Sequence, residues 1–142
     1  MDAALFEAAQ AGENGEVPVG AIVVKDGRII GRGGNRPLSG HDPTAHAEII
    51  AIRQAALALG SDRLTGCSLW VTLEPCAMCA GAIAHARIER LYYGASDAKG
   101  GAVEHGPRLF SQPTIHHRPE IYSGIGAEDS AKLLTAFFKD KR

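Results

Sequence analysis

Hydrophobic residues recur along this chain with two different periods, and each period predicts a different kind of element. Residues 4–14 carry alanines and two larger apolar residues at helical spacing, and glycines end the run, which predicts a first helix. Residues 19–35 then hold two runs rich in β-branched side chains, separated by Asp26 and Gly27. Because an Asp-Gly pair tolerates the positive φ angles of a tight turn, these runs predict an antiparallel hairpin.

A second helix and a strand–helix–strand unit are predicted in the middle of the chain. The polar residues 36–44 include proline and glycine and predict a loop, and a long helical pattern follows from about Ala45 to a closing Gly60. A unit of strand, helix and strand comes next, and a unit in this order favours parallel pairing of its two strands. Its three elements are expected at residues 67–72, 76–86 and 90–96.

The last third of the chain is less regular. Residues 97–119 contain several glycines and prolines, and no element is predicted there. Residues 120–125 have the composition of a short last strand, and residues 127–142 form an amphipathic pattern with acids in its first turn and bases in its last, which predicts a closing helix. No internal repeat or linker interrupts the sequence, so we expect one α/β domain that spans residues 1–142.

Composition narrows the class of protein. The chain has 142 residues, of which 45% are hydrophobic and 22% charged, a balance typical of one globular domain. No apolar run approaches the ~20 residues of a membrane helix, and the N-terminus lacks the pattern of a secretory signal, so we expect a cytoplasmic protein with no membrane partner. The net charge of −1 argues against general nucleic-acid binding, so any RNA contact must come from a local patch.

Two cysteines in the segment TLEPCAMCAG stand three residues apart, directly after a proline. Cys76 and Cys79 could form a redox dithiol, part of a metal site, or a pair of inert buried thiols. Three cysteines in all are too few for a disulfide scaffold, and Cys67 lies outside this spacing, so we interpret Cys67 as a small buried hydrophobe. A second motif at His46 and Glu48 favours the metal site.

His46 opens the second predicted helix, as Cys76 opens the third. Zinc takes imidazole nitrogen and thiolate sulfur in a tetrahedral shell, and a catalytic site supplies three protein ligands and leaves the fourth position to water. The helix after Cys76 points its free amides toward this sulfur, which favours the thiolate. His46, Cys76 and Cys79 are therefore the predicted ligands of one Zn²⁺. A lone histidine at a helix start more often caps the helix than binds a metal, but His46 has two cysteines as possible co-ligands.

Glu48 stands two residues beyond the histidine, in the first turn of the same predicted helix. Two thiolates cancel the charge of the zinc and leave it a weaker acid toward its water, so a further base is needed. Glu48 could take this proton and return it to the substrate and the leaving group, which fits hydrolysis of an electron-poor carbon that carries an amine. In the alternative interpretation, Glu48 only complements the positive end of the helix.

The sequence HAE followed by PCAMC resembles the zinc-dependent cytidine/deoxycytidylate deaminase superfamily, whose pattern implies the same roles for these residues. The match extends to GEVPVGAIVV, NRPLSGHDPTAHAEIIAIRQA, LWVTLEPCAMCAGAIAHARI and YGASDAKGGA, which resemble the bacterial tRNA-specific adenosine deaminases. The resemblance implies a cytidine-deaminase-like three-layer α/β/α fold with a central five-stranded mixed sheet. It also implies a homodimer and conversion of the wobble adenosine (A34) of a tRNA anticodon stem-loop to inosine.

The resemblance further implies residues that bind the RNA. Asn35 would hydrogen-bond the target base or its ribose, while Asp97 and Lys99 would lie by the flanking nucleotides. Phe138 and Arg142, in the aromatic and basic C-terminus, would bind the anticodon loop. Each also has a simpler interpretation. Asn35 could be a turn residue, and Asp97 and Lys99 could be solvated loop charges. Phe138 could be a core residue, and Arg142 could complement the end of the last helix. Of the adjacent Phe137 and Phe138, we expect one to pack and the other to face RNA.

Two rival functions stay open at the level of the sequence. A small-molecule deaminase, acting on guanine, cytosine or a free nucleotide, would share the zinc chemistry and differ in its pocket. A structural zinc or redox protein would want a fourth protein ligand and no poised carboxylate, and this sequence suits neither condition. Residues 103–119 depart from the family pattern, and the sequence alone does not predict their conformation.

Overall fold

The computed structural model describes residues 1–140 of the chain. After a first helix and a hairpin, helices alternate with strands, which is the pattern of an α/β protein. In chain order the elements are α1 (Asp2–Glu13), β1 (Gly20–Lys25), β2 (Arg28–Gly34), α2 (Ala47–Leu59), β3 (Ser68–Leu73), α3 (Ala77–Ala86), β4 (Arg90–Ala95), η1 (Leu109–Ser111), β5 (Glu120–Tyr122) and α4 (Ala127–Asp140).

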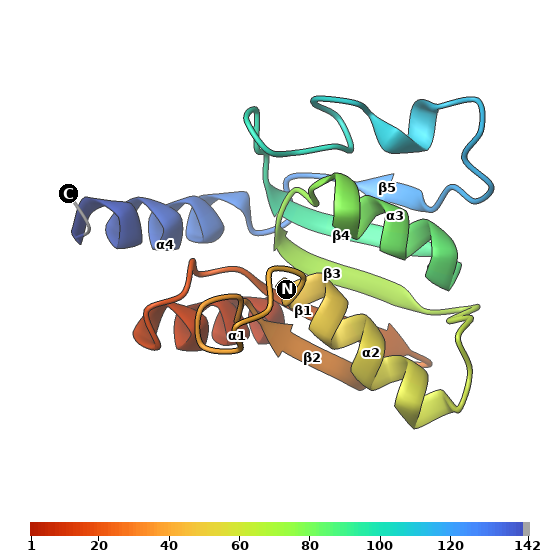
Figure 1. Ribbon diagram of the computed structural model, residues 1–142, viewed down its shortest axis with the longest axis horizontal. Coiled ribbons are helices and arrows are strands. Elements are labelled where there is room, and N and C mark those ends of the chain that lie inside the picture. Colours follow the sequence, from red (N-terminus) through yellow and green to blue (C-terminus); the bar gives the residue numbers. More distant parts are fainter. Residues whose placement is uncertain (141–142) are drawn as a thin grey trace.

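The strands form a five-stranded mixed sheet in the order β2-β1-β3-β4-β5 (Figure 1). β1 is antiparallel to both β2 and β3, whereas β3, β4 and β5 are parallel. The parallel pairing of β3 with β4 around α3 confirms the prediction. Because β1 is antiparallel to both neighbours, β2 and β3 run in the same direction, and the carboxyl ends of β2, β3 and β4 lie at one edge of the sheet. We call this edge the carboxyl edge.

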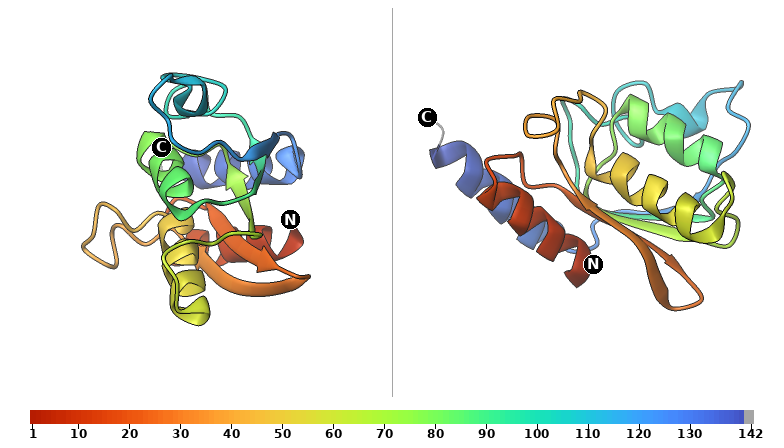
Figure 2. Two further views of the ribbon diagram at one scale, coloured as in Figure 1. Left: turned by 90° about the vertical axis from the view of Figure 1, so that its right-hand side faces the viewer. Right: turned by 60° about the horizontal axis from the view of Figure 1, so that its bottom comes forward.

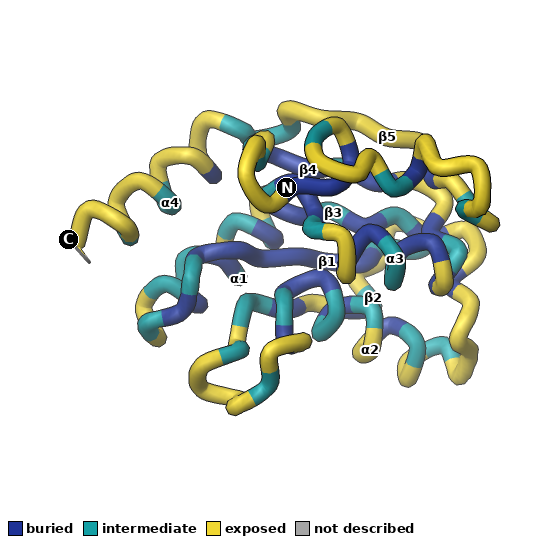
Figure 3. Tube along the Cα trace, turned by 45° about the horizontal axis from the view of Figure 1, so that its top comes forward, coloured by how far each residue is buried: buried dark blue, intermediate teal, exposed yellow. Residues whose placement is uncertain are grey.

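Helices cover both faces of the sheet. α2 and α3 lie on one face and contact each other, and α1 and α4 lie side by side on the other (Figure 1, Figure 2). This arrangement confirms the expected three-layer α/β/α fold. α4 is mostly exposed, whereas β1 and β3 are largely buried at the centre (Figure 3). None of the helices within residues 1–140 is long and apolar enough to cross a membrane.

The β1–β2 hairpin turns where the sequence predicts it. Asp26 and Gly27 have φ angles of 50° and 76°. Two successive positive φ angles form the tight turn whose twist matches that of paired strands, so this dipeptide determines both the turn and its position. Further along β2, a Cβ at Gly31 would lie 2.2 Å from the carbonyl oxygen of Ala51 in α2. Glycine therefore lets α2 lie directly on β2.

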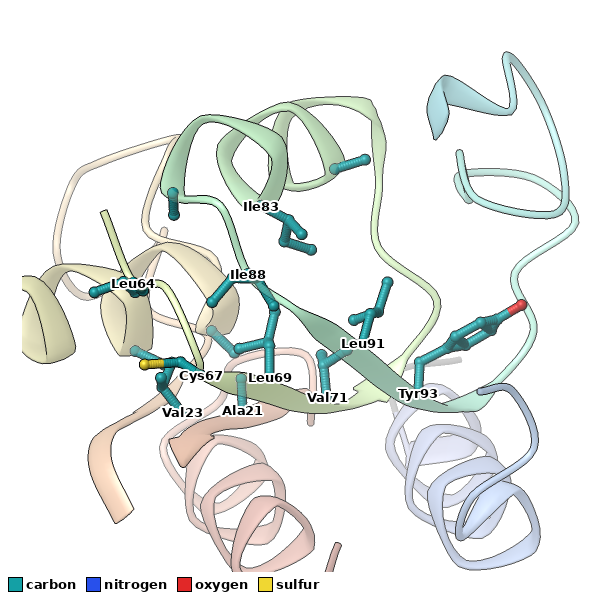
Figure 4. Packing of buried hydrophobic residues seen from close by; sticks show 14 of the residues in the cluster. Ala21, Val23, Leu64, Cys67, Leu69, Val71, Ile83, Ile88, Leu91 and Tyr93 are labelled. Carbon is teal, nitrogen blue, oxygen red and sulfur yellow. The ribbon is translucent and has the colours of Figure 1, made fainter. Parts of the chain in front are cut away.

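The main hydrophobic core lies between the sheet and the layer of α2 and α3. Leu69, Val71 and Leu91 extend from β3 and β4, and Ile83 of α3 belongs to the same cluster (Figure 4). Full burial of such side chains stabilises the fold by about 1.5–3 kcal/mol each. Cys67 is 1% exposed and belongs to this cluster, which confirms its interpretation as a small buried hydrophobe.

Several element boundaries differ from the predicted ones. α1 begins earlier, at Asp2, whose charge complements the positive end of the helix. α2 begins at Ala47 and not at Ala45, because His46 has an extended backbone with φ −74° and ψ 153°. The last strand has three residues. Residues 97–119 are irregular, as expected, apart from the 3₁₀ turn η1.

Candidate metal centre and active site

Two helices begin at the carboxyl edge, and the residue that precedes each helix is a potential metal ligand. His46 and Cys76 are the N-cap residues of α2 and α3, and neither side chain caps its own helix. α2 follows β2 and α3 follows β3, and these strands end at the same edge. The topology therefore brings together two residues that are 30 positions apart in the sequence.

The side chains of His46, Cys76 and Cys79 converge on one point. Nδ1 of His46 lies 3.6 Å from Sγ of Cys76 and 3.5 Å from Sγ of Cys79, and the three ligand atoms lie within 4.8 Å of one another. Zinc binds sulfur at about 2.3 Å and nitrogen at about 2.0–2.1 Å, so a tetrahedral angle separates the two ligand atoms by about 3.6 Å. The observed distances fit a single tetrahedral cation. Among the described residues, these three form the only such cluster.

The two thiols share a proton unequally. A hydrogen bond from the thiol of Cys79 lowers the pKa of Cys76 to about 5, against the opposing effect of burial. The same contact raises the pKa of Cys79, and burial raises it further. The pair therefore accepts one negative charge readily and the second only at a high cost. A divalent cation offsets this cost, because metals bind thiolates, so the donor set suits a divalent metal.

Glu48 lies beside the three potential ligands and is almost completely buried. It is in the first turn of α2, two residues after His46, and is 4% exposed. Burial raises the pKa of this carboxyl to about 7, and the charge of Cys76 acts in the same direction. A carboxyl that titrates near neutral pH can both accept and donate a proton in one reaction cycle. The position and the pKa therefore suit the predicted role of a proton carrier.

Asn35 joins the end of β2 to the start of α2. It follows the last residue of β2 and is half-buried. Its Oδ1 accepts a 2.9 Å hydrogen bond from the backbone N–H of Ala47, a donor that the helix itself leaves without a partner. The bond fixes the start of α2 next to His46. The bond uses the amide oxygen of Asn35 and does not involve its NH₂ group.

A groove of about 1050 Å³ lies at the carboxyl edge and brings together three of the predicted RNA-binding residues. Asp97, Lys99 and Phe138 all line it. None of His46, Cys76 and Cys79 is among the residues that line the groove, but Leu73, which does line it, stands three residues before Cys76. The groove therefore adjoins the segment that carries both cysteines. Its other lining residues are Val17, Ser96, Leu134, Thr135 and Lys139.

The aromatic pair of α4 divides between packing and exposure. Phe138 is 47% exposed and faces the groove, whereas Phe137 is half-buried. Their rings meet edge to face with a centroid distance of 5.3 Å. One phenylalanine is thus more buried than the other, in the manner expected from the sequence. Arg142, the last predicted RNA-binding residue, lies outside the described residues.

Sequence reasoning missed two buried glutamates that hold the loops around the site. Glu16 is 1% exposed and Glu74 is 2% exposed. Glu16 accepts hydrogen bonds from the backbone N–H groups of Leu38 and Ser39, at 3.2 and 2.8 Å, in the loop that leads to His46. Glu74 likewise accepts hydrogen bonds from backbone N–H groups of the loop after β4. Acidic residues are usually exposed, so the sequence gives no reason to expect burial of these two. The one feature that they share locally is a nearby proline, in the segments EVP and LEP.

Comparisons with known proteins agree with this geometry. A family model described as MafB19-like deaminase matches residues 1–142. The chain belongs to the MafB19-like deaminase family. This family member is also 61% identical to a tRNA-specific adenosine deaminase of Agrobacterium fabrum, over 142 residues that cover all of this chain and 93% of the relative.

Solved structures of deaminases have the same fold as this family member. One, from a study of A-to-I editing by tRNA:A34 deaminases at the wobble position, is 61% identical, with a TM-score of 0.93 over 94% of this chain and 97% of that chain. A guanine deaminase from Bacillus subtilis is 33% identical, with a TM-score of 0.65 over 96% of this chain and 89% of that chain. The chain therefore resembles the tRNA deaminase more closely than the guanine deaminase.

Proposed function

We propose that this chain hydrolyses adenosine 34, the wobble nucleotide of a tRNA anticodon, to inosine and ammonia. The observation that carries the proposal is the arrangement of one histidine and two cysteine side chains at tetrahedral spacing beside a buried glutamate. The chain that holds them is 61% identical to a tRNA-specific adenosine deaminase. In this proposal His46, Cys76 and Cys79 hold one zinc ion per chain, since zinc favours nitrogen and thiolate donors in this arrangement. When bound, zinc supplies a water of lowered pKa.

Glu48 moves the protons in the proposed reaction. Its carboxylate takes a proton from the attacking water, whose oxygen forms a bond to C6 of the adenine ring. Glu48 passes this proton to N1 of the ring, and then carries the second proton of the water to the amine. The C6–N bond breaks, ammonia leaves, and the C6 carbonyl of inosine remains. A pKa of about 7 allows Glu48 to serve as base and acid at neutral pH.

Recognition of the RNA would use the groove as well as the metal site. Adenosine 34 must leave the stack of loop bases to reach C6, as in other enzymes that act on a base. Asn35 would donate a hydrogen bond from its NH₂ group to the base or ribose. Lys99 and Lys139 would attract phosphates of the neighbouring nucleotides, and the exposed ring of Phe138 would stack on a base. Arg142 would extend this basic end of the chain.

We further propose that residues 1–142 act as one deaminase domain and that two copies form a homodimer in the cytoplasm. The support for the dimer is the resemblance of the sequence to the tRNA-specific adenosine deaminases. Light scattering in solution should give about twice the 14.9 kDa of one chain, and a monomer at all concentrations would contradict this part of the proposal.

A small-molecule deaminase is the second candidate function, because a guanine deaminase has the same fold. Pockets for small ligands bury most of the ligand surface. Here the groove next to the cysteine segment is about 1050 Å³ and carries two lysines and an exposed aromatic ring. A free base would leave these groups without a partner, whereas a strand of several nucleotides would contact them. This observation favours RNA.

A panel of substrates distinguishes the two functions. The zinc-loaded protein is incubated separately with an anticodon stem-loop that carries A34, and with free adenosine, cytidine and guanine, and released ammonia is measured. We expect release from the stem-loop and none above background from the free compounds. Conversion of guanine with no change in the RNA would overturn the tRNA proposal.

A further inference from the structure

Glu74 connects the cysteine segment to the loop that lines the groove. It follows Leu73, the last residue of β3, and stands two residues before Cys76. The residue is 2% exposed, so its carboxylate is almost completely withdrawn from water. The hydrogen-bond partners of the carboxylate all lie in residues 97–105, which follow β4 (Figure 1). We call residues 97–105 the groove loop.

Five donor groups of the groove loop meet this carboxylate. Oε1 accepts a hydrogen bond from the backbone N–H of Asp97 at 3.0 Å and lies 2.7 Å from Nδ1 of His105. Oε2 accepts from three successive backbone N–H groups, those of Val103, Glu104 and His105, at 3.1, 3.0 and 3.1 Å. Successive N–H groups directed at one atom form a nest for an anion. The carboxylate of Glu74 therefore occupies an anion nest that the groove loop forms.

The groove loop is shaped around the carboxylate. At Gly101 a Cβ would lie 2.5 Å from the carboxyl carbon of Glu74, so the loop passes too close for any side chain at that position. Within the loop, Oδ1 of Asp97 accepts hydrogen bonds from the backbone N–H groups of Lys99 and Gly100, at 3.1 and 2.9 Å. The turn that presents Asp97 and Lys99 to the groove is thus held from its buried side by Glu74.

A further contact holds the end of the same loop. The hydroxyl of Tyr93, in β4, donates a hydrogen bond to the carboxylate of Glu104. Tyr93 belongs to the hydrophobic core cluster, and its hydroxyl end is directed toward the segment that follows β4 (Figure 4). Tyr93 and Glu74 therefore hold the loop at neighbouring points, and Glu74 is the one that also reaches Asp97.

We propose that Glu74 is a positioning residue for the substrate, which holds the groove loop so that Asp97 and Lys99 face the groove and thereby sets the affinity for RNA. The inference rests on the proposed function, because its kinetic test uses the RNA substrate. The contacts between Glu74 and the groove loop do not depend on the proposed function. Glu74 acts through the loop and not on the reacting atoms.

A positioning role and a purely structural role change different kinetic parameters. If Glu74 only stabilises the fold, its loss lowers the fraction of folded, metal-loaded enzyme, so the apparent kcat falls and KM stays the same. If Glu74 positions the groove loop, the folded enzyme binds RNA more weakly. KM then rises, while kcat for each metal-loaded chain changes little.

Glu74→Gln is the variant that separates the two roles. It keeps the size of the side chain but replaces one acceptor oxygen by an NH₂ donor that opposes the N–H groups of the loop. We expect full zinc content, a nearly normal kcat and a KM for the A34 anticodon stem-loop raised about tenfold. Glu128→Gln is the matched control, because the Glu128 side chain is 85% exposed in α4, and it should change none of these values.

His105→Ala is a milder second variant. It removes the imidazole donor and leaves the carboxylate with its four backbone donors, so we expect the same kinetic signature with a KM raised about threefold. The His105 side chain is 37% exposed, which makes this variant easier to accommodate if Glu74→Gln does not fold.

Hydrogen exchange tests the role of Glu74 without any substrate. The amides of Val103, Glu104 and His105 should exchange at least about tenfold faster in Glu74→Gln than in the wild type. Unchanged exchange at these amides would overturn the inference, and so would an unchanged KM in Glu74→Gln, whatever its zinc content. If the wild type does not deaminate the RNA but exchange changes as expected, the proposed function is wrong and the contact between Glu74 and the groove loop is supported.

Discussion

At the scale of single residues, Glu48 separates metal binding from proton transfer. It is not one of the three side chains at tetrahedral spacing, and burial raises its pKa to about 7. Glu48→Gln keeps the size of the side chain and removes the base, so we expect full zinc content and a rate of deamination lowered by about 10³-fold. Metal analysis and single-turnover deamination of the stem-loop measure the two effects. Wild-type activity in this variant would refute the assigned role.

Cys76 and Cys67 offer a matched test of the metal site. Both are free thiols, but Cys76 lies 3.6 Å from the ring of His46, whereas Cys67 is in the hydrophobic core. Because a serine hydroxyl is a poor zinc ligand, Cys76→Ser should lose zinc and activity together. Cys67→Ala should keep its zinc and lower the free energy of unfolding by about 1 kcal/mol. Zinc analysis and urea denaturation distinguish them, and full zinc content in Cys76→Ser would contradict the ligand assignment.

The sequence was sufficient to predict that His46, Cys76 and Cys79 lie close together, but it did not predict the burial of Glu16 and Glu74. The spacing of Cys76 and Cys79 and the helix start at His46 are local signals. Glu74, in contrast, is buried by partners such as Val103, 29 residues further along the chain, and no short pattern encodes such a contact. An isolated glutamate is usually exposed, so burial of this one could be found only in the folded structure.

At the scale of elements, a buried carboxylate also holds the loop that leads to α2. The backbone N–H groups of Ser39 and Leu38 lower the pKa of Glu16, although burial acts in the opposite direction. A lowered pKa stabilises the fold above the unfolded value, near 4.5, and this stabilisation is lost as the pH falls through the folded value. Glu16→Gln should therefore lower the free energy of unfolding by about 2 kcal/mol at pH 7 and by less at pH 4.

Urea denaturation at the two pH values tests this prediction. Glu13→Gln is the control, because Glu13 is exposed, lies at the end of α1 and is only three residues from Glu16. The control should match the wild type at both pH values. A loss of stability in Glu16→Gln that is equal at pH 7 and pH 4 would show that the charge of Glu16 does not hold the loop.

Sequence patterns predicted some element boundaries correctly, and they placed the start of α2 too early. The turn at Asp26 and Gly27 was predicted correctly, because it depends on backbone angles that this dipeptide favours. The start of α2 was predicted at about Ala45, but the helix begins at Ala47. His46 has to stay extended at the N-cap to direct its ring toward the thiols, and hydrophobic periodicity contains no information about that requirement.

At the scale of the whole molecule, the topology of the sheet explains how distant residues meet. Asn35, Glu74 and Ser96 each follow directly the last residue of a strand, and these strands, β2, β3 and β4, end at the carboxyl edge. The sequence predicted the parallel pairing around α3. Periodicity did not give the strand order, because pairing between β1 and β3 joins segments far apart in the chain. The candidate metal site, the groove and the groove loop all lie at this carboxyl edge.

The central claim is that the chain converts a wobble adenosine to inosine, and position-resolved mapping of inosine tests it most directly. The zinc-loaded protein is incubated with an A34 anticodon stem-loop, and with a second stem-loop that has guanosine at position 34 and keeps its other adenosines. Mass spectrometry of nuclease fragments then locates inosine. We predict inosine at position 34 of the first RNA and none in the second. Absence of inosine from the first RNA, or conversion of adenosines at other positions in both, would contradict the account.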